Sequence, residues 1–148
     1  MLVSTNYDPD LDPDPSTWRS IDAHDRVRLV MSHHAQNRIS VSDSRMHALL
    51  HVNIENMLLQ GKGPVTRALE KLRAEGHPRH KAIHILATVW LAYPVGSIGG
   101  SANLTHQEQQ LAFNAAMETI TGEGWLQMQT NCMLKGYEDI WLYRDRVH

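Results

Sequence analysis

Residues 44–60 read SRMHALLHVNIENMLLQ, and three polar side chains in this segment recur at every fourth position, His47, His51 and Glu55. Successive positions on a helix are rotated by about 100°, so residues four apart drift by only about 40° and project from one side. The apolar residues beside them are Leu50, Ile54 and Leu58. The three polar side chains therefore lie in or at the edge of the apolar stripe, where a solvated helix does not place charges.

A second segment repeats this arrangement. His80 and His84 are also four apart, in the sequence RHKAIH of residues 79–84. The apolar residues on their face are Ile83, Ala87 and Trp90. Helical bundles build metal sites from side chains on facing helices. We therefore predict that the two histidine-bearing helices meet in the core and enclose a metal ion.

Helical periodicity and capping signals continue along the chain, and no alternating strand pattern of convincing length occurs. Ser16 and either Ser42 or Ser44 are predicted N-caps, Pro64 suits a first helical turn, and THQE from Thr105 matches a capping box. The first predicted helix covers about residues 17–37, and the second runs from the cap at Ser42 or Ser44 to about Gln60. The others cover about 64–76, 78–93, 105–122 and, more weakly, 125–147. The predicted fold is all-α, a bundle of about five to six helices in a single domain at 16–148.

Residues 1–15 form a separate acidic arm. The segment DPDLDPDP at residues 8–15 alternates aspartate with proline and leucine. Proline favours extended backbone and the aspartates favour water, so this arm is predicted to be extended and solvated.

Composition restricts the partners. The 14 Lys and Arg against 16 Asp and Glu give a net charge of −2, which does not indicate nucleic-acid binding. The single cysteine, Cys132, excludes an intrachain disulfide and cysteine-based metal sites. No signal-peptide pattern precedes the domain, and the apolar run at 83–95 is too short to span a membrane. A cytoplasmic location without membrane contact is expected.

The predicted metal ligands are His47, His51, Glu55, His80 and His84, with His34 as a further ligand from the inner face of the first helix. Imidazole suits zinc, iron, copper or nickel, and an added carboxylate extends the choice to manganese. Iron, zinc or manganese is therefore the expected cofactor. If two metals bind, Glu55 would be the bridging carboxylate. With His47 and His51 it could also form a two-histidine, one-carboxylate metal face, or it could be the general base while the histidines alone hold the metal.

Two classes of function follow. One is an enzyme acting on a small-molecule substrate, a non-haem iron oxidase or oxygenase in preference to a metal-dependent hydrolase. The other is a non-catalytic protein in which the histidines form a buried hydrogen-bond network or bind structural zinc. Trp125, Met128, Met133 and Trp141 would then offer a partner or homo-oligomer surface. Taken singly, His24, His33, His77 and His148 are expected to be core or exposed residues.

The stretch from His47 to His84 resembles an uncharacterised bacterial family of small helical proteins with paired LHxxxE and RHEAIH-like motifs. The matching residues are Leu50-His51, Glu55-Asn56, Gly76, Arg79-His80, Ala82, Ile83 and His84. The family implies no established activity. Its glutamate in the second motif is Lys81 in this chain, so the general base of an H-E-x-x-H zinc protease is missing.

The order of the histidines is also similar to that of hemerythrin-like four-helix bundles. His34, then His51 with Glu55, then His80 with His84 follow the same succession. The last element departs, because His106 is followed five residues later by Leu111 in place of aspartate. The resemblance implies an analogous site geometry rather than a common fold or oxygen carriage.

Overall fold

The computed structural model describes residues 6–38, 43–61, 63–93 and 104–130, and within these ranges the chain forms seven helices and no strand. The helices are α1 (Pro15–Ser20), α2 (Ala23–Gln36), α3 (Ser44–Leu59), α4 (Pro64–Ala74), α5 (Arg79–Ala92), α6 (His106–Thr119) and α7 (Gly122–Thr130). The predicted all-α class is confirmed. The number of helices is higher than predicted, because one predicted helix is two.

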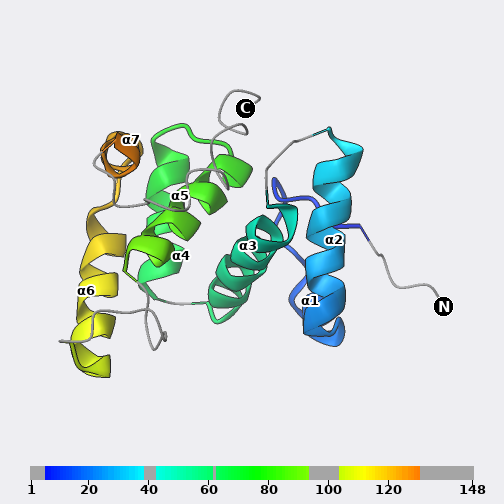
Figure 1. The fold of residues 1–148 in the computed structure, drawn as a ribbon, viewed down its shortest axis with the longest axis horizontal. Coiled ribbons are helices and arrows are strands. Elements are labelled where there is room, and N and C mark those ends of the chain that lie inside the picture. Colours follow the sequence, from blue (N-terminus) through cyan, green and yellow to red (C-terminus); the bar gives the residue numbers. More distant parts are fainter. Residues whose placement is uncertain (1–5, 39–42, 62, 94–103, 131–148) are drawn as a thin grey trace.

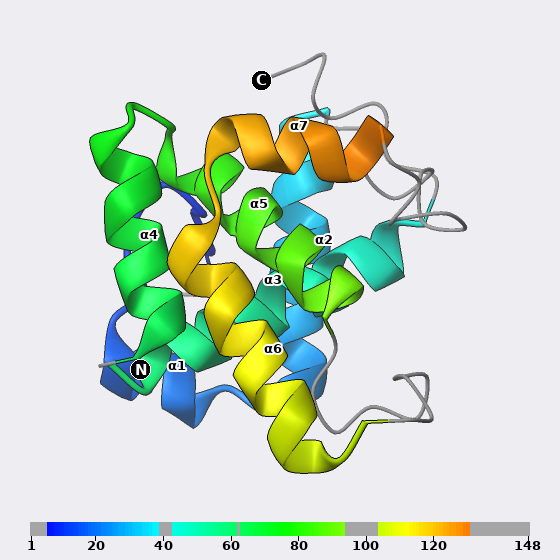
Figure 2. The same ribbon diagram turned by 90° about the vertical axis from the view of Figure 1, so that its left-hand side faces the viewer.

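The helices follow one another across the molecule nearly in chain order (Figure 1). Helix α3 packs against α2 on one side and against α4 and α5 on the other. Figure 2 shows α6 and α7 lying over α5, with α4 alongside. The two histidine-bearing segments, α3 and α5, are therefore direct neighbours in the interior.

The break between α1 and α2 comes from two aspartate caps. Asp14 accepts the backbone N–H of Thr17 and also the hydroxyl of Ser16, so Asp14 caps α1 in place of the predicted Ser16. Ile21 is extended (φ −89°, ψ 129°), and Asp22 then caps α2 through the N–H of Asp25. The chain thus leaves α1 at the extended residue Ile21 and restarts a helix at the carboxylate cap Asp22, where apolar spacing alone predicts one continuous helix.

The other helix boundaries agree more closely with the predicted signals. Asp43, between the two predicted serines, caps α3 through the N–H of Met46. Pro64 begins α4, Gly76 (φ +102°) follows it, and both bonds of the capping box at Thr105 are present. Helix α7 begins at Gly122, earlier than predicted, and residues 131–147 of the predicted last helix lie outside the described residues.

Two apolar clusters form the core. The larger one joins α3, α4, α5, α6 and α7, and α5 is buried at every position from Ala82 to Val89. The smaller one holds Tyr7 and Trp18 against Val27 and Val30 of α2 and against one face of α3. None of the helices in the described part of the chain combines the length and apolar character needed to cross a bilayer.

The described part of the N-terminal arm is docked on the helices, which corrects the prediction of a solvated segment. Tyr7 and Pro9 are buried, whereas Asp8, Asp10, Asp12 and Asp14 remain exposed. The aspartates favour water as predicted, but the single aromatic residue of the arm has enough apolar area to hold the segment against the bundle.

The cap of α6 leads to a testable pH dependence. Hydrogen bonds from Thr105 N–H and hydroxyl hold the pKa of Glu108 below its ordinary value of 4.5. Because the folded-state pKa is lowered, the stabilisation is complete above about pH 4.5 and is lost as the pH falls through the lowered pKa. Wild-type protein should therefore be more stable than Glu108→Gln at neutral pH, with the difference vanishing in acid.

Urea midpoints measured from about pH 7 to 3 give this comparison. Glu70→Gln, which removes an exposed carboxyl from α4, controls for the change in net charge. A Glu108→Gln difference that stays constant across the whole pH range would contradict the expected role of the charged cap.

Candidate metal centre

Four histidines from three helices converge in the interior. His34 comes from the last turn of α2, His51 from the middle of α3, and His80 and His84 from the first two turns of α5. One ligand atom from each lies within 4.8 Å of all the others. The four side chains are 0–4 % exposed. The chain thus contains a buried four-histidine cluster at distances consistent with metal binding.

One close pair in this cluster joins the two predicted motifs. His51 Nε2 of α3 lies 2.9 Å from His84 Nε2 of α5. Zinc–nitrogen bonds of 2.0–2.1 Å in a tetrahedron place ligand nitrogens about 3.3 Å apart. The 2.9 Å separation and the 4.8 Å limit for the whole group lie on either side of that value, so the spacing is consistent with four ligands of one ion.

Hydrogen bonding orients His34 for such a role. Its Nδ1 lies 2.8 Å from the carbonyl oxygen of Val30, one turn earlier in α2. A carbonyl oxygen only accepts, so Nδ1 carries the proton and donates it. The lone pair of neutral His34 is consequently on Nε2, the nitrogen that lies 3.0 Å from His47 Nε2. This is the tautomer in which Nε2 can bind a metal.

His47, also a predicted ligand, lies directly beside the cluster. Its Nε2 is 3.0 Å from His34 Nε2, and its ring centroid is 4.6–4.9 Å from those of His34, His51 and His84. It is 1 % exposed. His47 is not one of the four residues within mutual ligand distance, so its role as a ligand stays a prediction.

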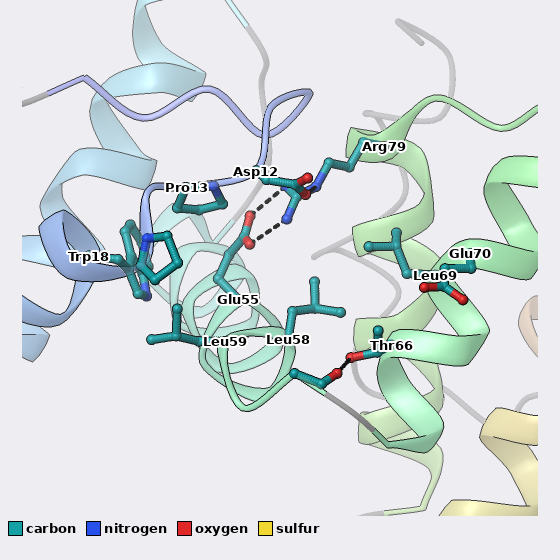
Figure 3. A pocket seen from close by; sticks show the side chains of 12 residues that line it. Asp12, Pro13, Trp18, Glu55, Leu58, Leu59, Thr66, Leu69, Glu70 and Arg79 are labelled. Carbon is teal, nitrogen blue, oxygen red and sulfur yellow. Dashed lines mark hydrogen bonds and ion pairs between the residues drawn. The ribbon is translucent and has the colours of Figure 1, made fainter.

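Glu55, the predicted carboxylate ligand or general base, faces a different group. Arg79 Nη2 donates to Glu55 Oε1 at 2.7 Å, Arg79 Nη1 donates to Oε2 at 2.9 Å, and the hydroxyl of Tyr7 donates to Oε2 at 2.6 Å. Figure 3 shows the two-bond contact between Glu55 and Arg79. Glu55 lies outside the four-residue group, and its metal-binding or catalytic role stays a prediction.

Burial and charge act together on this polar layer. Burial opposes the charge of Arg79, but the hydrogen bonds and the charge of Glu55 outweigh it and raise the pKa of the guanidinium. Burial also raises the pKa of Tyr7 well above its ordinary value, and the neighbouring Glu55 raises it further. Arg79 is therefore charged and Tyr7 is a protonated phenol at neutral pH.

A cavity of about 400 Å³ lies beside this pair. Figure 3 shows Trp18 and Leu59 on one side of it and Leu58, Leu69 and Thr66 on the other, with Asp12 beside Arg79. The lining includes Glu55 and Arg79 and none of the four clustered histidines. Glu55 therefore lines the cavity and is also linked, through the Tyr7 hydroxyl, to His51 of the cluster.

The described histidines that the sequence sets apart as single residues are elsewhere or peripheral, and His148 lies outside the described residues. His24 and His106 are exposed and His77 is half-buried. His33 is half-buried, and its ring lies 5.5 Å from His34 and 5.8 Å from His80.

Sequence reasoning missed two residues of the surrounding layer, Tyr7 and Arg79. The signal for Arg79 was its position immediately before His80, and the signal for Tyr7 was the presence of a lone aromatic residue in an acidic arm. The chain matches no protein-family model, no curated protein and no solved structure, so the geometry alone supports a function.

Proposed function

We propose that this protein binds a divalent transition-metal ion through His34, His51, His80 and His84. The observation that carries the proposal is the convergence of these four buried imidazoles, with their ligand atoms within 4.8 Å of one another. A buried polar group costs free energy unless it is bonded, and one cation can bond to all four clustered imidazoles at once.

The donor set favours zinc or iron over manganese. Imidazole nitrogens suit zinc, copper, iron and nickel, whereas manganese prefers carboxylate and water oxygens. The predicted carboxylate ligand, Glu55, has both oxygens engaged by Arg79 and Tyr7. Of the three expected metals, zinc and iron therefore fit an all-histidine site better than manganese does.

Closure of the site favours a structural role. Structural zinc sites have four protein ligands, whereas catalytic sites keep one position open to solvent or substrate. Four histidines at 0–4 % exposure supply all four ligands and join α2, α3 and α5. We infer that the ion holds these helices together, which is the role of structural zinc in a non-catalytic protein.

The cavity beside Glu55 favours a second candidate, a non-haem iron oxidase or a metal-dependent hydrolase. Its volume of about 400 Å³ is in the range of small-molecule sites. A small-molecule substrate bound there would contact Glu55 and Arg79, and Glu55 would be the group that accepts a proton. Because none of the four histidines lines this cavity, the bound ion would supply Lewis-acid or redox chemistry there only if the Glu55–Arg79 pair opened.

Elemental analysis of protein purified without added metal tests metal binding. We expect near-stoichiometric zinc or iron in the wild-type chain and its loss in a His51→Ala/His84→Ala variant. A His24→Ala/His106→Ala variant is the matched control, because it removes two exposed histidines, and it should keep the metal.

The opposite result has a definite meaning. If the wild-type chain holds no metal even after anaerobic loading with iron or zinc, the metal-binding proposal is wrong. The close pairs His51–His84 and His34–His47 are then hydrogen bonds between imidazoles, and the site variant lowers stability only.

A further inference from the structure

We propose that Tyr7 is a positioning residue of the metal centre, which makes His51 a metal ligand by fixing its tautomer. Residues 6–14, the described part of the N-terminal arm before α1, are then a functional part of the centre. This inference rests on the proposed function and extends it to a residue that does not contact the ion.

The hydroxyl of Tyr7 lies between two groups whose chemistry determines its direction. It is 2.6 Å from Glu55 Oε2 and 3.2 Å from His51 Nδ1. The carboxylate of Glu55, paired with Arg79, only accepts hydrogen bonds, so the single phenol proton goes to Glu55. The phenol oxygen is left as an acceptor, and His51 Nδ1–H is the donor that fits.

The direction of the hydrogen bond between Tyr7 and His51 determines which ring nitrogen of His51 has a lone pair for a metal ion. A neutral imidazole with its proton on Nδ1 has its lone pair on Nε2. His51 Nε2 is the nitrogen that lies 2.9 Å from His84 Nε2, inside the group of four. Ligand histidines in metalloproteins commonly donate their other N–H to a carboxylate or carbonyl, which orients the ring and increases its basicity.

The arm is anchored at the same turns that carry the ligands. Arg79, which holds Glu55, also donates to the Pro9 carbonyl at 2.8 Å and to Asp12 at 2.9 Å. Asp10 accepts the backbone N–H of His80 at 3.1 Å. Contacts from residues 7–12 therefore reach Glu55, Arg79 and the ligand positions 51 and 80, so arm docking and ligand orientation are coupled.

Tyr7 also fills space, which the experiment must separate from its hydrogen bonds. It is 7 % exposed, and its ring centroid lies 5.7 Å from that of Trp18. Tyr7→Phe keeps the ring and removes the hydroxyl. Tyr93→Phe is the matched control, since Tyr93 is half-buried at the far end of α5.

The affinity of the full chain for Zn²⁺ is measured by competition with a chromophoric chelator. Loss of an outer hydrogen-bond partner typically weakens metal affinity by about 10–100-fold, and we expect this for Tyr7→Phe. Tyr93→Phe should bind like wild type. Equal affinities for Tyr7→Phe and wild type would overturn this inference alone, whereas absence of both Zn²⁺ and Fe²⁺ binding by wild type would overturn the proposed function.

A double-variant comparison separates positioning from general destabilisation. If Tyr7 acts through His51, Tyr7→Phe has no further effect on Zn²⁺ affinity in a His51→Gln background and keeps its effect in a His34→Gln background. The same loss in both backgrounds would show a purely structural role and overturn the inference.

Nitrogen-15 NMR of the metal-free wild-type chain tests the tautomer without any substitution in Tyr7. The inference requires His51 to carry its proton on Nδ1. A proton on Nε2, with Nδ1 unprotonated, would overturn it. Because this measurement uses the wild-type chain, it stands even if the Tyr7→Phe variant does not fold.

Discussion

Replacing Arg79 by methionine is expected to lower the free energy of unfolding by about 3–5 kcal/mol. Arg79 is 4 % exposed and Glu55 is 2 % exposed, and two hydrogen bonds join them. Methionine retains much of the side-chain volume but leaves the Glu55 carboxylate buried without its counter-charge. Breaking a buried pair at one partner is costly for this reason, even where the intact pair adds little net stability.

Urea unfolding measures this loss, and two further variants interpret it. Arg79→Met/Glu55→Gln should recover part of the loss, because the buried negative charge is also removed. Arg67→Met breaks the exposed ion pair with Glu118 and should have little effect, since water screens that pair. A cost for Arg79→Met no larger than that for Arg67→Met would contradict the expectation.

Zinc is expected to raise the melting temperature of the metal-free chain by about 8–16 °C when its free concentration is about 1,000 times the dissociation constant. At that ratio, binding to the folded state alone adds about 4 kcal/mol of stability. A domain of this size shifts by about 2–4 °C per kcal/mol. The physical cause is that the four ligands converge only in the folded chain.

Differential scanning calorimetry with zinc and then with excess chelator measures this shift. The chelator should reverse it, and His51→Ala/His84→Ala should melt at the same temperature with and without zinc. His24→Ala/His106→Ala should respond like wild type. An equal rise in the site variant would place the zinc-binding residues outside the four-histidine cluster.

Local sequence determines the helices and the histidine spacing. Four-residue spacing places His47, His51 and Glu55 on one side of α3, and His80 and His84 on one side of α5, whatever the helices pack against. Helix starts at Pro64 and Thr105 are equally local, because the groups that satisfy a helix end lie within a few residues of it.

Tertiary packing decides which of these side chains meet. Glu55 follows His51 by one turn, yet it faces Arg79 and Tyr7, while His34 from α2 joins the group of four. Spacing specifies the face of a helix but not the partner helix, its rotation or the segment that covers it. Tyr7 is 44 residues from His51 along the chain, and only long-range burial of its ring brings its hydroxyl there.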